Sequence, residues 1–292
     1  MIIVSGANGK LGRAVVERLL DRVEPERVGV CVRDLEKASE LAERGVRVRR
    51  GDFADASSLE HAFEGASQVL VVSVDSTGET ALRLHETAIA AAGKAGAGRV
   101  VYTSHMGSNP SSSFPPMLDH AATEAVLRES GIPFTSLRNG FYASSAAMLL
   151  GGALETGELA VPEDGPVSWT SHADLAEAAA IALTDDVFDG VSPDLTGSEA
   201  VDMAGIAAIA SELTGRPIRR VVVPEADYRA GLLGHGLPEP VADMLVGMFA
   251  ASRQGEFARV DPALARLLGR PPVPVREVLT TFSAPLPSPP RS

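Results

Sequence analysis

Short apolar runs alternate along the first half of the chain with longer segments in which apolar residues recur at helical spacing. The chain opens on one such run, Ile2-Ile3-Val4, and further runs predict strands at residues 28–32, 46–49, 68–73, 99–104 and 133–137. The segments between them predict helices at residues 13–22, 35–44, 57–63, 79–95 and 117–130. Because most of these strands are mainly apolar rather than alternating, the pattern predicts an α/β fold, a parallel sheet covered by helices on both faces.

The pattern changes after residue 150, where turns that contain glycine or proline become frequent. Helices are predicted at residues 173–183, 203–214, 225–233 and 239–251, with short strands at 191–195 and 219–223. Together they predict a smaller, mixed α/β lobe over residues 151–283, with part of the chain returning to the sheet. We expect this lobe to cap the carboxyl edge of the sheet, where open α/β sheets bind ligands. Residues 284–292 contain four prolines and predict a flexible tail.

A glycine turn joins the first strand to the first helix, in the sequence Gly6-Ala7-Asn8-Gly9-Lys10-Leu11-Gly12. In such a turn one glycine lets the chain leave the strand sharply, one lets backbone N–H groups approach a pyrophosphate, and one lets helix and strand pack closely. The diphosphate then lies at a helix N-terminus, which favours negative charge. The turn predicts a Rossmann-like, doubly wound dinucleotide-binding domain over residues 1–150. The cofactor-binding residues predicted from it are Gly6, Asn8, Gly9, Lys10, Leu11 and Gly12.

The end of the second strand, Val32-Arg33-Asp34, bears on which dinucleotide binds. An acidic residue at this place holds a ribose 2′-hydroxyl, whereas an arginine accommodates a 2′-phosphate. Asp34 directly precedes the predicted helix 35–44 and can serve as its N-cap. Arg33 is then left to face a 2′-phosphate, with Lys37 nearby. The sequence therefore favours NADP(H) over NAD(H).

Two further strand ends supply candidate cofactor contacts. The sequence Gly51-Asp52-Phe53 follows the third strand. Asp52 and Phe53 either reach the adenine ring or form a turn in which the aspartate starts the next helix. Ser73 ends the fourth strand, and we expect it beside the cofactor because the carboxyl ends of strands line the crevice.

Composition and charge exclude several classes of protein. The chain has 292 residues, 45% of them hydrophobic, with a single cysteine, Cys31, in an apolar run. It therefore offers no disulfide framework and no thiol metal site, and we expect no bound metal. A net charge of −12 argues against a nucleic-acid partner. No signal peptide precedes the first strand and no apolar run suits membrane insertion, so the sequence predicts a cytoplasmic protein.

Several motifs together resemble a known family. These are the glycine turn, Val32-Arg33, Gly51-Asp52-Phe53, Tyr102-Thr103-Ser104, His120-Ala121-Ala122-Thr123-Glu124 and Leu137-Arg138-Asn139-Gly140-Phe141-Tyr142. They resemble the NmrA-like branch of the atypical short-chain dehydrogenases/reductases, and within it the bacterial NAD(P)H:quinone oxidoreductases of the QorB type. The resemblance extends from Met1 to about Leu279. It implies an NAD(P)H-dependent reductase and places Thr103 and Ser104 beside the cofactor.

The chain departs from the wider superfamily in its catalytic residues. Ordinary short-chain dehydrogenases use a Tyr-x-x-x-Lys pair to protonate a carbonyl oxygen, and this region has none. His120 and Glu124 stand four residues apart on one helix face instead. Glu124 can bond either His120 or the nicotinamide ribose, and His120 is either a proton donor or a structural residue.

Two residues near the end of the sixth strand complete the catalytic candidates. Tyr142 supplies a hydroxyl to the acceptor or packs in the crevice. Asn139 orients the carboxamide or caps the next segment. His105 is a further candidate at the end of the fifth strand.

The missing tyrosine–lysine pair points to a particular acceptor. A quinone that receives a hydride becomes an anion delocalised over its ring, so it needs little help from an acid, and catalysis depends chiefly on orientation. The sequence thus predicts an NADPH-dependent reductase of quinones or similar electron-poor aromatics, compatible with a homodimer. Two alternatives stay open. One is an NAD(P)-sensing regulator that acts on a protein partner, and the other is a tailoring reductase or isomerase in aromatic natural-product biosynthesis.

Overall fold

A parallel sheet of seven strands runs through the centre of the protein, in the order β10-β6-β5-β4-β1-β2-β3. A computed structural model describes residues 1–283, so the predicted flexible tail at 284–292 lies outside the described residues. The sheet strands are β1 (Ile2–Ser5), β2 (Val28–Val32), β3 (Arg47–Arg50), β4 (Gln68–Val71), β5 (Arg99–His105), β6 (Phe134–Asn139) and β10 (Gly190–Leu195). Every adjacent pair is parallel. The order reverses between β1 and β4, which places a ligand crevice at their carboxyl ends.

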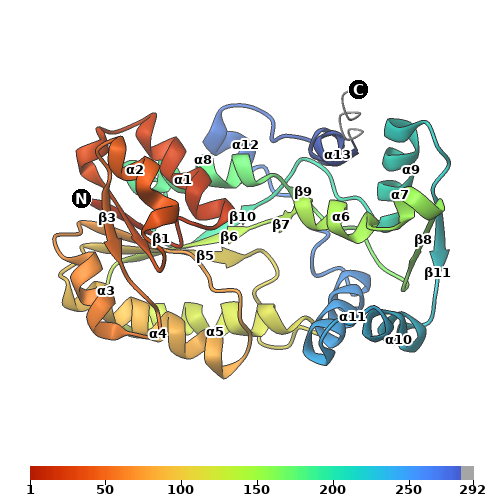
Figure 1. The fold of residues 1–292 in the computed structure, drawn as a ribbon, viewed down its shortest axis with the longest axis horizontal. Helices are drawn as coiled ribbons and strands as arrows, with labels where there is room; N and C mark the ends of the chain where they lie inside the picture. Colours follow the sequence, from red (N-terminus) through yellow and green to blue (C-terminus); the bar gives the residue numbers. More distant parts are fainter. Residues whose placement is uncertain (284–292) are drawn as a thin grey trace, which may run out of the picture.

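Helices cover both faces of this sheet (Figure 1). One face carries α1 (Lys10–Leu20), α2 (Ser39–Glu43), α8 (His172–Thr184) and α12 (Ala263–Leu268). The other carries α3 (Ala56–Phe63), α4 (Glu79–Lys94) and α5 (Pro115–Glu129). Side-chain caps fix where two of these helices begin: Asp55 accepts from Ser57 and Ser58 before α3, and Ser171 accepts from Asp174 before α8. The predicted doubly wound α/β fold is confirmed.

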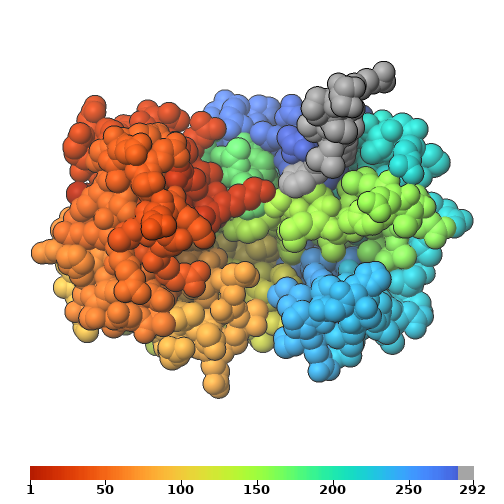
Figure 2. Space-filling view, viewed as in Figure 1, coloured from red at the N-terminus to blue at the C-terminus, as the bar shows by residue number. Residues whose placement is uncertain are grey.

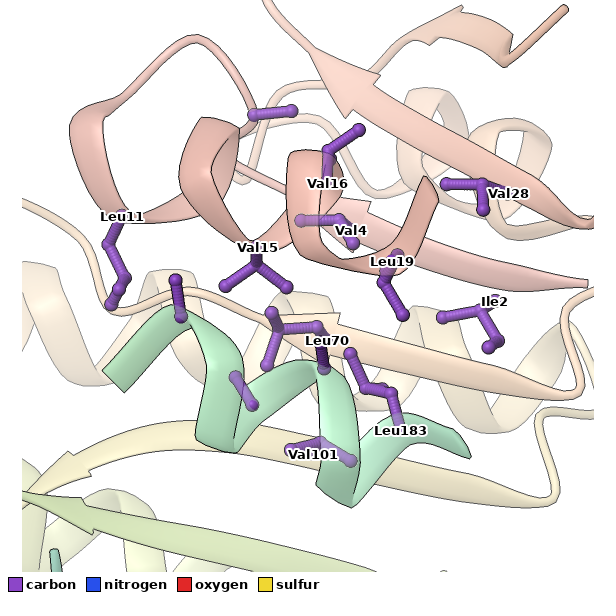
Figure 3. Packing of buried hydrophobic residues seen from close by; sticks show 14 of the residues in the cluster. Ile2, Val4, Leu11, Val15, Val16, Leu19, Val28, Leu70, Val101 and Leu183 are labelled. Atoms are coloured by element: carbon purple, nitrogen blue, oxygen red, sulfur yellow. The ribbon is translucent and has the colours of Figure 1, made fainter. Parts of the chain in front are cut away.

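The apolar runs of the sequence form the core because both faces of each central strand are covered. On the α1 side, Val15 and Leu19 pack against Val4 of β1 and Leu183 of α8 (Figure 3). On the other side, Ile3 and Tyr102 face α3, α4 and α5 in a second buried cluster. Full burial of such side chains stabilises a fold by about 1.5–3 kcal/mol each.

The helix predicted at residues 35–44 is the one that differs most. The chain forms a 3-10 turn at Glu36–Ala38 and then the short α2. Asp34 explains the change, because its carboxylate accepts a hydrogen bond from the backbone N–H of Glu36 at 3.1 Å. An aspartate that bonds the backbone two residues on favours a turn over a regular helix start.

A second group of elements forms a lobe at the end of the molecule opposite the N-terminal half, in green to blue colours (Figure 2). It contains two small parallel pairs, β11 (Arg219–Val222) with β8 (Glu158–Val161) and β7 (Phe141–Tyr142) with β9 (Trp169–Thr170). Its helices are α6 (Ala143–Leu150), α7 (Ala153–Thr156), α9 (Met203–Thr214), α10 (Glu225–Gly234), α11 (Glu239–Arg253) and α13 (Val275–Ser283). They share a core with Trp169, Ile206 and Phe249.

Three elements beyond residue 150 pack with the sheet rather than with this lobe. Strand β10 pairs with β6, α8 packs against α1, and α12 packs against α8 and β10. The division of the chain at residue 150 into two folding units stays a prediction. No helix among residues 1–283 is both long enough and apolar enough to cross a membrane.

We expect the change Gly12→Ala to lower the free energy of unfolding. A Cβ atom at Gly12 would lie 2.4 Å from the backbone oxygen of Gly6, so the first turn of α1 would have to move away from β1. Such overpacking costs about 1–2 kcal/mol, which outweighs the better helix propensity of alanine. Urea denaturation measures the loss. In the matched control Gly231→Ala, on α10, a Cβ atom meets nothing within 4 Å and stability should rise slightly.

Candidate active site

A cleft of about 500 Å³ lies at the carboxyl ends of the central strands, where the strand order reverses. Eight of the predicted cofactor residues line it: Gly6, Asn8, Gly9, Arg33, Lys37, Asp52, Phe53 and Ser73. The cleft also takes in residues that we did not predict as cofactor contacts, among them Cys31, Val72 and Leu84. Leu84 projects from α4, and its helical spacing gives no sign that distinguishes it from a core residue.

The remaining five predicted cofactor residues do not line this cleft. Leu11 places its side chain in the core, and Gly12 lies under the backbone of Gly6. Thr103 lies behind the cleft and positions Ser73, because its hydroxyl accepts a hydrogen bond from the backbone N–H of Ser73 at 2.8 Å. Ser104 faces a second cavity, described below. Lys10 begins α1, and its charge lowers the pKa of His172, after the larger effect of burial.

The glycine turn has the geometry of a phosphate cradle. Gly6 adopts φ +63°, a conformation that favours glycine. The helix α1 follows Gly9, its N-cap residue, which offers no side chain to cap the first N–H groups. The start of α1 favours an anion, because the first N–H groups of a helix point out of its end and the helix dipole is positive there. Asn8 connects the turn to the segment that follows β2, because its amide donates to the backbone oxygen of Asp34 at 2.8 Å.

Arg33 lies exposed at the edge of the cleft and forms no hydrogen bond or ion pair with any residue in the range 1–283. Asp34 is occupied by its turn bond to Glu36 and lies 3.5 Å from the amine of Lys37. Because the carboxylate of Asp34 is engaged by Glu36 and Lys37, the guanidinium of Arg33 is the charged group available to a ligand at this edge of the cleft.

Asp52 and Phe53 form one wall of the cleft. The carboxylate of Asp52 accepts from the backbone N–H of Ala54 at 3.0 Å, so it takes the turn-forming role, while Phe53 lines the space. Burial, and to a lesser extent the charge of Asp52, raise the pKa of the neighbouring Cys31 thiol to about 12. Cys31 is therefore protonated near neutral pH and does not act as a nucleophile.

A larger cavity of about 980 Å³ adjoins the cleft, and Ser73 lines both spaces. At the sheet end it is lined by Ser104, His105 and His120, with Tyr142 of β7. Its other walls come from the lobe. They are formed mainly by Leu149, Leu159, Val161, Leu232, Leu237, Met244, Leu245 and Met248. Ligand pockets of about 300–1,000 Å³ commonly bury a whole small molecule.

The tautomer of His105 is fixed by the backbone. Its Nδ1 atom accepts a hydrogen bond from the N–H of Gly107 at 3.0 Å, so the proton of the neutral ring is on Nε2. Burial, and then the neighbouring His120, keep the pKa of His105 well below its usual value. Edge-to-face contacts with Phe141 and Phe257 hold the ring in place. No residue in the range 1–283 accepts from Nε2–H, which leaves this donor for the cavity.

His120 belongs to a buried chain of polar groups. Its Nδ1 atom lies 2.8 Å from the Tyr102 hydroxyl, and its ring stacks on His105 with centroids 6.1 Å apart. Behind them, His85 Nδ1 bonds Thr123 at 2.9 Å, and His85 Nε2 accepts from Val74 on the cofactor side. Burial is the main cause that lowers the pKa of His120 to about 3, so the ring is neutral near pH 7.

Glu124 does not bond His120, contrary to one of the expectations for it. Its Oε1 atom accepts from Ser104 at 2.8 Å and Ser136 at 3.1 Å, and Arg138 Nη2 donates to Oε2 at 2.8 Å. Burial alone would raise the pKa of Glu124, but the hydrogen bonds and charge of Arg138 lower it below its usual value. The carboxylate instead joins α5 to β5 and β6, and Glu124 lines neither the cleft nor the larger cavity. A catalytic role for Glu124 stays a prediction.

Asn139 ends β6 and Tyr142 ends β7, where the chain passes from the sheet into the lobe. Burial raises the pKa of Tyr142 to about 12, against the opposing effect of its hydrogen bond with Asn139. The Tyr142 ring packs on His172 with centroids 4.3 Å apart. Tyr142 lines the cavity, whereas Asn139 is buried behind it and its Oδ1 atom has no hydrogen-bond partner. The tyrosine is a hydrogen-bond donor and a poor acid near neutral pH.

The methionine and phenylalanine pattern of residues 244–249 divides between two roles. Phe249 is buried in the lobe core against Tyr228, while Met244 and Met248 line the cavity as well as packing in that core. Among residues 1–283 there is no group of three or more His, Cys, Asp or Glu side chains placed to hold a metal ion.

Comparison with known proteins agrees with this geometry. A family model described as NAD(P)H-binding matches residues 6–186. Quinone oxidoreductase 2 of Escherichia coli is 32% identical over 280 residues, covering 95% of this chain and 96% of that protein. A crystal structure of the NADPH-dependent quinone oxidoreductase from Escherichia coli, complexed with NADPH, has a TM-score of 0.92 at 31% identity and covers 97% of this chain and 99% of the other.

Two further relatives act on other acceptors according to their names. The triphenylmethane reductase of Citrobacter sp., complexed with NADP(H), has a TM-score of 0.90 at 31% identity, covering 97% of this chain and 100% of the other. The NAD(P)H azoreductase of Xenophilus azovorans is 30% identical over 272 residues, covering 93% of this chain and 94% of that protein.

Proposed function

We propose, because the chain belongs to the NAD(P)H-binding family, that it is an NADPH-dependent reductase that transfers a hydride to quinones or similar electron-poor aromatic acceptors. One observation supports the proposal most directly. The cleft that suits a dinucleotide and the larger apolar cavity lie next to each other, and Ser73 lines both. A reductase needs this arrangement, since its two substrates must lie against each other. The direct test is NADPH consumption with 1,4-benzoquinone as acceptor.

The residues of the cleft fit NADP(H). Gly6 and the N-terminus of α1 would hold the pyrophosphate, Arg33 the 2′-phosphate, and Phe53 would lie against the adenine side. The unpaired guanidinium of Arg33 is the structural feature that favours NADPH over NADH. When bound, NADPH supplies a hydride to the acceptor.

The reaction balances without any other redox partner. A C–H bond of the dihydronicotinamide breaks, and its two electrons and hydrogen pass to the quinone. A proton from solvent completes the hydroquinone, and NADP⁺ is left. The chain therefore has to orient the acceptor and stabilise the negative charge that develops on its oxygen.

His105 is the residue best placed to provide that stabilisation. Its Nε2–H is a fixed donor at one end of a largely apolar cavity, and a neutral imidazole donates without having to lose its proton. Tyr142 offers a second hydrogen-bond donor, its hydroxyl, to the same cavity. With depressed histidine pKa values and a raised tyrosine pKa, neither residue is a strong acid near pH 7. The site suits acceptors whose reduced form is stabilised within its own ring.

We expect His105→Phe to lower kcat/KM for 1,4-benzoquinone by about tenfold, the value of one neutral hydrogen bond. Phenylalanine retains the ring between Phe141 and Phe257 but removes the donor. His105→Gln, which keeps an N–H donor, should recover part of the loss. Because His105 is neutral, the wild-type rate should stay flat between about pH 6 and 8. Equal rates for the wild type and His105→Phe, with unchanged NADPH affinity, would remove His105 from the mechanism.

The cavity also bears on the sensor alternative. A regulator that only senses NAD(P) has no need of an acceptor space, whereas this chain keeps a large one next to the cofactor cleft. This favours the enzyme. A tailoring reductase or isomerase would use the same cleft, and the acceptor panel described in the Discussion distinguishes it.

A further inference from the structure

The acceptor cavity is far larger than a single quinone ring requires. Its volume of about 980 Å³ stands at the upper end of the range of about 300–1,000 Å³ seen for pockets that bury drug-sized ligands. The polar groups that can meet a quinone oxygen lie where β5, α5 and β7 approach the cofactor cleft, and they are Ser104, His105, His120 and Tyr142. A lone ring held there would leave the lobe side of the cavity to water.

The lobe side is apolar and comes from four separate elements. Helix α6 contributes Leu149, β8 contributes Leu159, α10 contributes Leu232, and α11 contributes Leu245 and its methionines. Leu232, Leu237 and Leu245 belong to none of the hydrophobic core clusters formed by residues 1–283. Core packing therefore does not account for these leucines. Apolar side chains kept partly open to a cavity are typical of a ligand surface.

The charges of the residues that line the cavity limit which substituents a ligand can carry there. Glu158 is the one Asp, Glu, Lys or Arg residue among the described side chains that line the cavity, and it is ion-paired with Arg219 of β11. No lysine or arginine of the described chain lines it, so nothing there would neutralise an acidic substituent. The part of the ligand on this side is expected to be uncharged.

The cavity reaches the surface on the lobe side. Met148, which lines it, is 75% exposed, and Glu158 and His235 are exposed as well. A long substituent could thus leave through this opening rather than fold back on itself. Methionine side chains such as Met244 and Met248 adapt to substituents of different shape.

We infer that the natural acceptor is a quinone that carries an uncharged apolar substituent, with its ring beside His105 and the substituent between α6, β8, α10 and α11. The inference rests on the proposed function and adds the class of acceptor to it. Leu232 and Leu245 are the residues that set the preference for the substituent.

The test is a series of 2-alkyl-1,4-benzoquinones of increasing chain length. We expect KM to fall by about two- to fourfold for each added methylene, as each becomes buried, and to level off when the chain reaches the opening at Met148. Binding of the matching alkylhydroquinones to the NADP⁺-loaded protein, measured by calorimetry, should follow the same series.

Two variants of α11 locate the effect. Leu245→Asn should flatten the dependence of KM on chain length. Val246→Asn, its neighbour on the same helix and outside the cavity lining, should keep it. If benzoquinone is reduced but neither KM nor the calorimetric affinity depends on chain length, the inference is wrong and the proposed function stands. If no quinone is reduced, the proposed function fails, and the calorimetric series alone then decides whether the apolar subsite exists.

Discussion

1,4-Benzoquinone is expected to be reduced about 10²–10⁴-fold faster than an aliphatic ketone such as acetone, the factor that a positioned general acid would otherwise supply. A ketone that accepts a hydride becomes an alkoxide, which needs a proton at once. In this cavity the available groups are neutral His105 and His120, whose pKa values are depressed by burial, and Tyr142, whose pKa is raised to about 12. A quinone avoids the difficulty because its ring carries the charge.

The measurement is steady-state kcat/KM with NADPH held constant and each acceptor varied. A nitroaromatic compound in the same panel tests whether electron-poor aromatics in general are accepted, and an enone tests the tailoring-reductase alternative. Comparable values for benzoquinone and acetone would show that an effective acid lies in the site, and the roles given to His105 and Tyr142 would then have to be withdrawn.

NADPH is expected to bind about ten- to a hundredfold more tightly than NADH, the second large effect. One charge-assisted contact between a guanidinium and a phosphate contributes about 1.5–3 kcal/mol, which corresponds to this range. Arg33 is suited to that contact because it lies exposed at the cleft without a partner in residues 1–283, whereas Asp34 is held by Glu36 and Lys37.

Titration of both reduced cofactors against the wild type and Arg33→Ala measures the preference. The variant should lose most of its affinity for NADPH and little for NADH. Arg50→Ala is the matched control, because Arg50 is an exposed arginine at the end of the neighbouring strand β3 and does not line the cleft. Equal affinities of the wild type for the two cofactors would contradict the assignment of Arg33.

The sheet and the glycine turn after β1 could be predicted from the sequence because local signals specify them. Apolar runs predicted most of the sheet strands to within a few residues, and Gly12 packs tightly against the backbone of Gly6, as the spacing of the glycines implies. Asp34 also behaves as its position before a helix suggests, although it favours a turn over a full helix.

The acceptor side could not be read in the same way, because long-range contacts determine it. Glu124 stands four residues from His120 but is bound by Ser104, Ser136 and Arg138, which come from other strands. Nothing local in the sequence indicates that the backbone of Gly107 fixes the tautomer of His105. The leucines of α10 and α11 meet the cavity only because the lobe folds back over the sheet edge.

The most direct test of the central claim is the stoichiometry of the reaction with 1,4-benzoquinone under exclusion of oxygen. NADPH consumption and hydroquinone formation are followed together on the wild-type protein. The proposed function predicts one hydroquinone for each NADPH oxidised, at a rate that depends on the protein concentration. Tight binding of NADPH without consumption in the presence of benzoquinone would contradict it and would favour the sensor.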